Sequence, residues 1–281
     1  MASKTTAAIV VAHPGHEVRL HGWLERERPL VFVLTDGAGR VGQPRIAATA
    51  RYLKKFDVPA GRIFGHLTDL EVYRLLLARD HERFIKLSEE LAEAFVAAEV
   101  GCVTGDASEG YNTAHDVARL LTNAAVEMAG RAAGRAVTNS DFPVVNRPDH
   151  CPEHLRARAL WLQLEDETFT RKIAAAFEFY PELAAETRDA LQGRGLEATL
   201  NHFKLHDDEH AATELSGLDL FRVECLRPVS VGDPPFEGDT PFYEKRGESK
   251  VQAGHYAQVI RYCDHLRPLE DALRENVERM L

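Results

Sequence analysis

The chain of 281 residues carries 34 Lys and Arg against 44 Asp and Glu, which gives a formal net charge of -10 at pH 7. No basic stretch offsets the repulsion between such a chain and phosphate, so the composition argues against general binding to nucleic acid and favours a small-molecule ligand. With 44% hydrophobic residues, the chain can bury the core of a single domain that spans residues 1–281.

The amino terminus has no segment typical of export or membrane insertion. One Lys precedes a short apolar run that ends at Pro14, and this run lacks the length and flanks of a signal peptide or a membrane span. The four cysteines form no CxxC pair, which favours free thiols over a zinc knot or a disulfide framework; they are Cys102, Cys151, Cys225 and Cys263. We therefore expect a cytoplasmic protein that makes no contact with membranes and that could form a homo-oligomer.

The first half of the chain alternates predicted strands with predicted helices. Short apolar, β-branched runs predict strands over 7–12, 30–34 and 100–104, and each run ends in a polar, glycine-bearing loop. Apolar residues at spacings of three or four predict helices over 45–56 and 81–98, and a third helix covers 117–133. This order indicates a three-layer α/β fold with a mostly parallel, Rossmann-like sheet, in which ligands bind beyond the carboxyl ends of the strands.

The second half is predicted to add helices and one strand to that sheet. Residues 152–215 have charged helical faces and little β-branching, which predicts a helical insertion or lid. Residues 218–226 restore a strand pattern, and a loop rich in Pro and Gly follows over 228–240. A final helix is predicted from about Lys250 to the carboxyl end, within a segment 240–281 that packs back on the active site.

Three histidines follow the predicted strands in a pattern typical of a catalytic metal site. His13 and His16 lie three residues apart in the loop after the first strand, and His115 follows the glycine-bearing loop after the third. Because the carboxyl ends of parallel strands meet at one edge, we expect the three imidazoles to lie close together. Three protein ligands leave a fourth position open for water, as catalytic zinc requires.

At these residues the sequence resembles the LmbE-like or PIG-L-like de-N-acetylases, whose first strand ends in AHP followed by two Asp and usually Glu. The segments VFVLTDGAGR at 31–40, VTGDASEGYNTAHDVARLL at 103–121 and KVQAGHYAQ at 250–258 resemble three further parts of that family. The resemblance covers roughly 7–135 and 240–265. It implies a zinc ion held by His13, His16 and His115, with His16 in place of the family's Asp ligand.

Two positions depart from the family pattern in ways that affect catalysis. Gly15 stands where the family has its general base, and Asn112 stands where many members have a His. The candidates for a replacement base near the strand edge are Glu17, Asp36, Asp106 and Asp116. If the chain is a deacetylase that has lost its base, the substitution Gly15→Asp should raise activity on N-acetyl sugars.

Further polar residues are candidates for contacts with a substrate. Tyr111, Asn112 and His255 could stabilise the oxyanion of a tetrahedral intermediate. Arg19, Arg40 and Arg45 could hold an anionic or hydroxyl-rich substrate, although for Arg45 a solvated helix face is the stronger interpretation. A turn before the last helix could close the pocket, with Tyr243, Glu244 and Arg246.

Two other histidine clusters compete for a metal ion. His150 with His154 forms one, and His206 with His210, four residues apart on one helical face, forms the other. For the second cluster a solvated, charged helix is the stronger interpretation. A dinucleotide site is disfavoured because the first strand is followed by HPGHE instead of GxGxxG.

The sequence thus predicts a zinc-dependent hydrolase that removes an acyl group, most simply acetyl, from an amine nitrogen of a sugar-like small molecule. Iron(II) or another divalent metal is an alternative to zinc, since imidazole binds these ions as well. The alternative function is a non-catalytic relative that binds a metal or a sugar and has lost hydrolysis, because Gly15 and Asn112 remove two usual catalytic groups.

Overall fold

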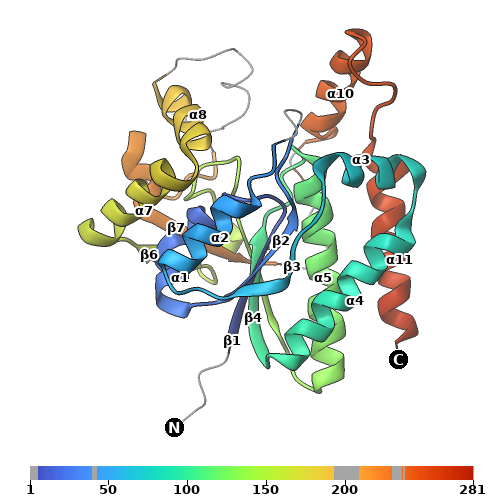
Figure 1. The fold of residues 1–281 in the computed structure, drawn as a ribbon, viewed down its shortest axis with the longest axis horizontal. Helices are drawn as coiled ribbons and strands as arrows, with labels where there is room; N and C mark the ends of the chain where they lie inside the picture. Colours follow the sequence, from blue (N-terminus) through green and yellow to red (C-terminus); the bar gives the residue numbers. More distant parts are fainter. Residues whose placement is uncertain (1–5, 40–42, 193–208, 230–235, 237, 281) are drawn as a thin grey trace.

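The computed structural model describes residues 6–39, 43–192, 209–229, 236 and 238–280. Its strands form one sheet in the order β3-β2-β1-β4-β5-β7-β6 (Figure 1). The neighbours from β3 through β5 pair in parallel, whereas β7 pairs antiparallel with both β5 and β6. The prediction of a mostly parallel sheet is therefore confirmed. The strands are β1 Thr6–Val11, β2 Leu30–Thr35, β3 Ala60–Leu67, β4 Val100–Asp106, β5 Thr138–Phe142, β6 Leu160–Gln163 and β7 Val223–Pro228.

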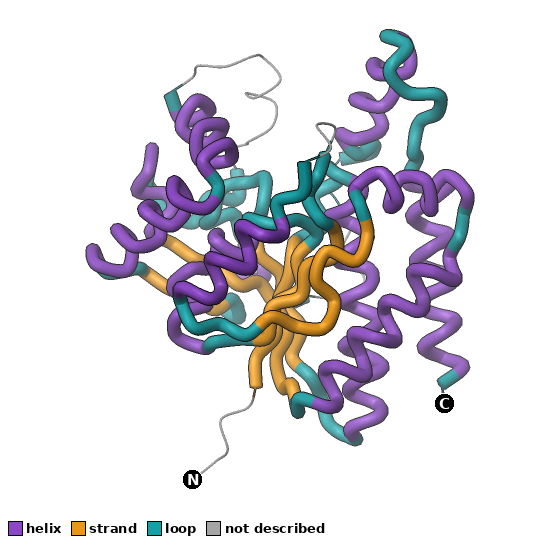
Figure 2. The backbone as a smooth tube through the Cα atoms, viewed as in Figure 1, coloured by secondary structure: helices purple, strands orange, loops and turns teal. Residues whose placement is uncertain are grey.

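Helices cover both faces of the sheet and complete the predicted three layers (Figure 2). One face carries α3 Asp69–Ala78, α4 His81–Ala97, α5 Thr113–Ala133 and α11 Arg267–Arg279, and the other carries α1 His21–Glu27, α2 Ile46–Lys55 and α7 Asp166–Phe179. The remaining helical elements are α6 Glu153–Arg156, α8 Pro181–Leu191, α10 Phe242–Gln252, the 3-10 turns η1 His16–Leu20 and η2 Gly217–Arg222, and the π turn η3 Tyr262–Leu266. Within the described ranges, no helix has both the length and the apolar content that crossing a membrane requires.

Strand β1 lies at the centre because both of its faces are apolar. Ala8 and Val10 belong to the core under α4 and α5, whereas Ala7, Ile9 and Val11 belong to the core under α1 and α2. Alternate residues of a strand point to opposite faces, so one apolar run supplies both cores. The loop after β1 is thereby fixed at the carboxyl edge of the sheet.

Helix α5 begins earlier than the sequence indicates. The side chain of Asn112 accepts a hydrogen bond from the backbone N–H of Ala114 at 2.9 Å and caps the helix. The predicted start at residue 117 is therefore four residues late, since His115 and Asp116 already belong to the first turn. The cap places His115 at the amino end of α5, directed toward the same sheet edge as the loop after β1.

Several predicted boundaries in the second half are wrong. Strand β6 interrupts the region predicted to be helical over 152–215, and residues 217–222 form η2, so that β7 begins only at Val223. The final helix does not begin near Lys250, which lies in α10. Gly254, with φ 71°, follows α10, and the last helix begins at Arg267 with a Pro in its first turn.

Candidate active site

The three histidines of the predicted metal site lie together. The ring centroids of His13 and His16 are 5.2 Å apart, those of His13 and His115 5.1 Å, and those of His16 and His115 4.7 Å. His13 follows β1, His16 opens η1 and His115 lies in the first turn of α5. Because β1 and β4 are neighbours in the sheet, the segments that follow them meet at one edge.

The turn between the first two histidines requires glycine. Gly15 has φ 105°, a left-handed conformation that residues with a Cβ rarely adopt. The left-handed turn reverses the chain within three residues, so His13 and His16 contact the same space. The substitution Gly15→Asp is consequently strained, whatever its chemical benefit.

Hydrogen bonds fix the proton of His13 on Nδ1. This nitrogen lies 2.8 Å from Thr35 Oγ1, and the Thr35 hydroxyl donates to the carbonyl of Ala12 at 2.9 Å. Since the hydroxyl proton is already committed, Oγ1 accepts from Nδ1–H. Asp69 Oδ1 lies 3.0 Å from the same nitrogen and is a second acceptor. The lone pair of His13 is therefore on Nε2, where a metal could bind.

A buried carboxylate fixes His16 in the same manner. Asp106 Oδ2 lies 2.8 Å from His16 Nδ1 and also accepts from the backbone N–H of Ala12 at 2.7 Å. A carboxylate behind a histidine is the usual arrangement around a metal-bound imidazole. Nδ1 of His115 is buried without a hydrogen-bond partner in the described part of the chain, a costly state that a further ligand would relieve.

Burial keeps two of the rings neutral, as metal ligation requires. Burial is the largest effect that lowers the pKa of His16, and Asp106 partly offsets it. Burial, together with the nearby His16 and His13, holds the pKa of His115 well below its usual range. Burial alone would raise the pKa of Asp69, but its interactions with the His13 ring and with the N–H of Gly39 hold it below its ordinary value. Asp69 is therefore a carboxylate at neutral pH.

The ring separations agree with those around one metal ion. Three imidazoles bound tetrahedrally, with nitrogens about 2.0–2.1 Å from zinc, have centroids about 5 Å apart. Among the described residues, no three His, Cys, Asp or Glu side chains form a group in metal-binding geometry. The ring separations nevertheless match, so these three imidazoles are the residues that would hold a divalent ion.

The carboxylates that the sequence offers as general bases have different surroundings. Asp106 is 1% exposed and is bonded to His16. Asp36, half-exposed, accepts from the N–H of Ala38 at 2.9 Å in the turn after β2. Asp116 is buried one residue beyond His115, and burial raises its pKa to about 7.

Glu17 is enclosed on the inner side of the turn that carries His13 and His16. It is fully buried, accepts from the N–H of Gly15 at 2.8 Å and also accepts the hydroxyl proton of Tyr180. Burial raises its pKa. These bonds give Glu17 a structural role in holding the turn, and they set it apart from the half-exposed Asp36.

Of the expected oxyanion donors, Asn112 lies nearest to the rings. Its amide nitrogen is 3.4 Å from His13 Nε2, while its oxygen caps α5. Tyr111 stacks on Phe242 of α10, with ring centroids 5.2 Å apart and planes at 4°. His255 is exposed in the segment after α10. The carboxyl-terminal segment therefore meets the loop before α5 through Phe242.

The arginines proposed to bind substrate are separated by the fold. Arg19 donates to the carbonyl of Val144 and lies 5.0 Å above the ring of Phe221, and Arg40 lies outside the described residues. Arg45 is close enough to His16 to lower the pKa of that ring. Among the described residues the Arg45 side chain has no hydrogen bond or ion pair, and its Nε is buried.

Sequence reasoning missed Thr35 and Asp69, the two acceptors behind His13. Asp69 lies two residues after β3, at the start of α3, and Asp36 and Asp106 stand at the ends of β2 and β4. No strand was predicted over Ala60–Leu67, because the segment holds two Gly and exposed polar residues. Recognising that strand would have revealed the carboxylate.

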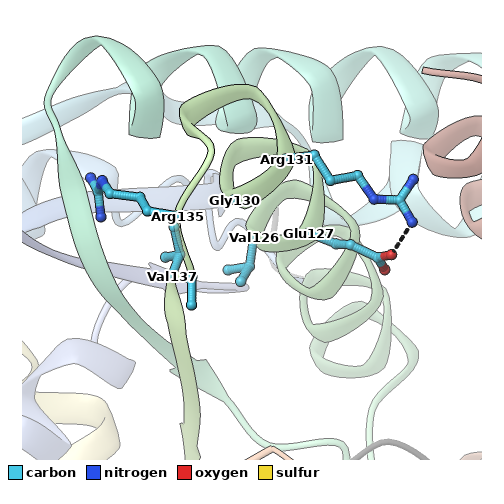
Figure 3. A pocket seen from close by; sticks show the side chains of 7 residues that line it. Val126, Glu127, Gly130, Arg131, Arg135 and Val137 are labelled. Carbon is cyan, nitrogen blue, oxygen red and sulfur yellow. Dashed lines mark hydrogen bonds and ion pairs between the residues drawn. The ribbon is translucent and has the colours of Figure 1, made fainter. Parts of the chain in front are cut away.

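The other features that could bind ligands lie elsewhere. His150 and His210 face each other with centroids 5.2 Å apart, His154 is exposed on α6, and His206 lies outside the described residues. A surface depression of about 370 Å³ lies at the carboxyl end of α5, beside the ion pair of Arg131 and Glu127 (Figure 3). Arg131 is sixteen residues along α5 from His115, about 24 Å at the helical rise.

No protein-family model matches the chain, and no curated protein matches it; the family resemblance of the sequence therefore stays a prediction. Solved structures similar to it include a conserved protein from Thermus thermophilus, with 17% identity over 70% of this chain and 84% of that chain, and a TM-score of 0.45. The A40926 pseudoaglycone deacetylase has 17% identity over 80% and 97% of the two chains, with a TM-score of 0.47. The zinc-inhibited form of teicoplanin deacetylase has 14% identity over 82% and 100%, with a TM-score of 0.49. Identities and TM-scores this low do not assign a function to this chain.

Proposed function

We propose that this protein is a metal-dependent hydrolase that removes an acetyl-sized acyl group from an amine nitrogen of a sugar-like small molecule. The observation that carries the proposal is the cluster of His13, His16 and His115, with centroids 4.7–5.2 Å apart. In two of the rings Nδ1 is bonded to an acceptor, which leaves Nε2 for the ion. The cofactor is zinc, with iron(II) as the alternative.

A divalent ion held by these imidazoles supplies Lewis-acid polarisation of the substrate carbonyl and acidifies a water molecule. Around it, Asp106 and the pair of Thr35 and Asp69 orient the imidazoles through their Nδ1 atoms. Asn112 directs an amide N–H toward His13 Nε2 and is placed to donate to a developing oxyanion. Arg45 is placed to hold hydroxyl or anionic groups of the amine portion.

A second candidate, a relative that binds the ligand but does not hydrolyse it, is favoured by one observation. The space beside Gly15, into which a base at that position would project, contains Leu183 and Tyr180. Proton transfer must then use a carboxylate elsewhere at the edge. Asp36 and Asp106 remain the candidates for that role.

Metal content and amine release together test the proposal. Purified protein and its His13→Ala, His16→Ala and His115→Ala variants would be loaded with zinc and analysed for metal per chain. Release of amine from N-acetylglucosamine would then be measured. We expect one zinc in wild type, none in the variants, and amine release only with zinc. Zinc binding without amine release supports the binding protein. Absence of bound metal after loading with zinc or with iron(II) overturns the hydrolase and leaves a sugar-binding relative.

A further inference from the structure

Helix α8 covers the metal-binding turn at Gly15. A Cβ at this position would lie 2.6 Å from Leu183 Cδ1 and 3.2 Å from Tyr180 Cδ1. The first distance is well below an ordinary van der Waals contact, so the Leu183 side chain already fills the space that a residue 15 side chain would occupy. Gly15 lies between His13 and His16 in the chain, so this apolar contact bears on the turn that carries two of the three imidazoles. Figure 1 shows α8 beyond the edge of the sheet at which β1 ends.

Hydrogen bonds to the turn hold the start of α8 in place. The Tyr180 hydroxyl donates to one carboxylate oxygen of Glu17, and the other oxygen accepts from the N–H of Gly15. The same Tyr180 hydroxyl lies 2.8 Å from Thr49 Oγ1. Tyr180 is 3% exposed, so its ring is a fixed part of the wall. Leu183 follows within one helical turn and is half-buried. Its position relative to the turn is consequently set by the same network.

We propose that Leu183 is a specificity-determining residue, whose side chain closes the metal-binding turn at position 15 and limits the substrate to a short acyl group. This inference rests on the proposed function. A leucine side chain offers no hydrogen bond, so the hydroxyl groups of a sugar-like amine would lose their solvation against it. The apolar part of the substrate, which is its acyl chain, therefore faces Leu183, and its length is limited by the space that Leu183 leaves.

A series of N-acetyl, N-butyryl and N-hexanoyl glucosamines tests the size limit. We expect Leu183→Ala to raise the ratio of kcat/KM for N-hexanoylglucosamine to kcat/KM for N-acetylglucosamine about tenfold or more. A single methylene group in an apolar pocket already changes such a ratio by about that factor. Leu183→Val should give an intermediate ratio. Glu182→Ala is the matched control, because Glu182 is an exposed neighbour on the same helix, and its ratio should equal that of wild type. An unchanged ratio in both Leu183 variants overturns the proposal.

A second measurement tests the placement of Leu183 without any substrate. Gly15→Ala should lower Tm in the wild-type background through both the φ of 105° and the contact with Leu183. In the Leu183→Ala background only the backbone strain and the Tyr180 contact remain, so the loss of Tm should be smaller. In the Glu182→Ala background the loss should be as large as in wild type. Equal losses in all three backgrounds would overturn the assignment.

The two measurements separate the inference from the proposed function. If wild type hydrolyses no member of the series while the Tm losses still differ, the proposed hydrolysis fails and the closing contact of Leu183 is supported. If wild type hydrolyses acetyl and hexanoyl substrates equally well, the proposed function stands and the size limit is overturned.

Discussion

Replacing Asp106 with Asn tests whether this carboxylate orients His16 or accepts the proton of the reaction. Asp106 Oδ2 receives two hydrogen bonds, from His16 Nδ1 at 2.8 Å and from the N–H of Ala12 at 2.7 Å, and the side chain is buried. An Asn carbonyl in the same position can accept both bonds. The substitution therefore preserves the geometry and removes the negative charge.

The expected effect follows from the role of a carboxylate behind a metal-bound imidazole. Loss of such a partner weakens metal binding about 10–100-fold, or about 1.4–2.7 kcal/mol. The ring of His16 becomes less basic without the charge that raises its pKa, so it becomes a weaker ligand. If Asp106 only orients His16, the loss of activity disappears once zinc saturates the variant.

The assay is titration of metal-free protein with zinc against a competing chelator, followed by kcat at saturating zinc. Asp36→Asn is the matched control, since Asp36 accepts from a backbone N–H and its Asn replacement can do the same. We expect wild-type zinc affinity in Asp36→Asn and weaker binding in Asp106→Asn. Wild-type affinity combined with a collapsed kcat in Asp106→Asn would refute the reasoning and make Asp106 the proton acceptor.

Three further predictions concern other parts of the fold. Burial lowers the pKa of His21 to about 4, so its protonation favours the unfolded chain, and this residue alone should lower the unfolding free energy by about 2 kcal/mol from pH 7 to pH 5. His21→Gln should flatten that urea-measured dependence, and parallel pH profiles would contradict the assignment. Glu224 accepts from the N–H groups of Gly22 and Trp23 and pairs with the buried Lys172 at 2.9 Å; Glu224→Ala should cost about 3–5 kcal/mol in urea unfolding. Adding Lys172→Met to Glu224→Ala should recover part of this loss, and no recovery would exclude an uncompensated charge as the cause. Asn112→Ala should lower stability by about 1 kcal/mol through loss of the α5 cap, whereas Asn112→Ser should keep the cap and lose the amide near His13. Full hydrolytic activity in the Ser variant would show that this amide has no part in the reaction.

The sequence predicts a strand of this fold best where both faces of that strand are buried. Strands β1 and β2 are covered on both faces and therefore have nearly continuous apolar sequences, and β4 has a shorter apolar run before its polar end. β5 has the polar sequence TNSDF, and β6, with the sequence LWLQ, is only four residues long and partly exposed. They form because β4 and β7 offer backbone groups for pairing. A sequence pattern cannot show such a dependence on neighbours.

The site could be predicted only where its residues follow predicted strands. His13, His16 and His115 follow β1 and β4, and Asp106 ends β4, so their strand-edge positions were expected. Arg45 had been favoured as a solvated helix residue, and its proximity to His16 depends on the turn after β2. Leu183 comes to Gly15 across 168 positions of the chain, through a hydrogen bond between Tyr180 and a buried Glu17. No local spacing encodes that contact.

The division of β1 between two cores also has a consequence for how the molecule unfolds. Ile9 and Val11 stabilise one helical layer, and Ala8 and Val10 stabilise the other, so neither layer can melt while the strand keeps its native environment. Amide protons of β1 should therefore exchange with deuterium only through global opening, at the slowest rate in the chain. Heat should remove both layers in one cooperative transition, and the loop carrying His13 and His16 should persist until that transition.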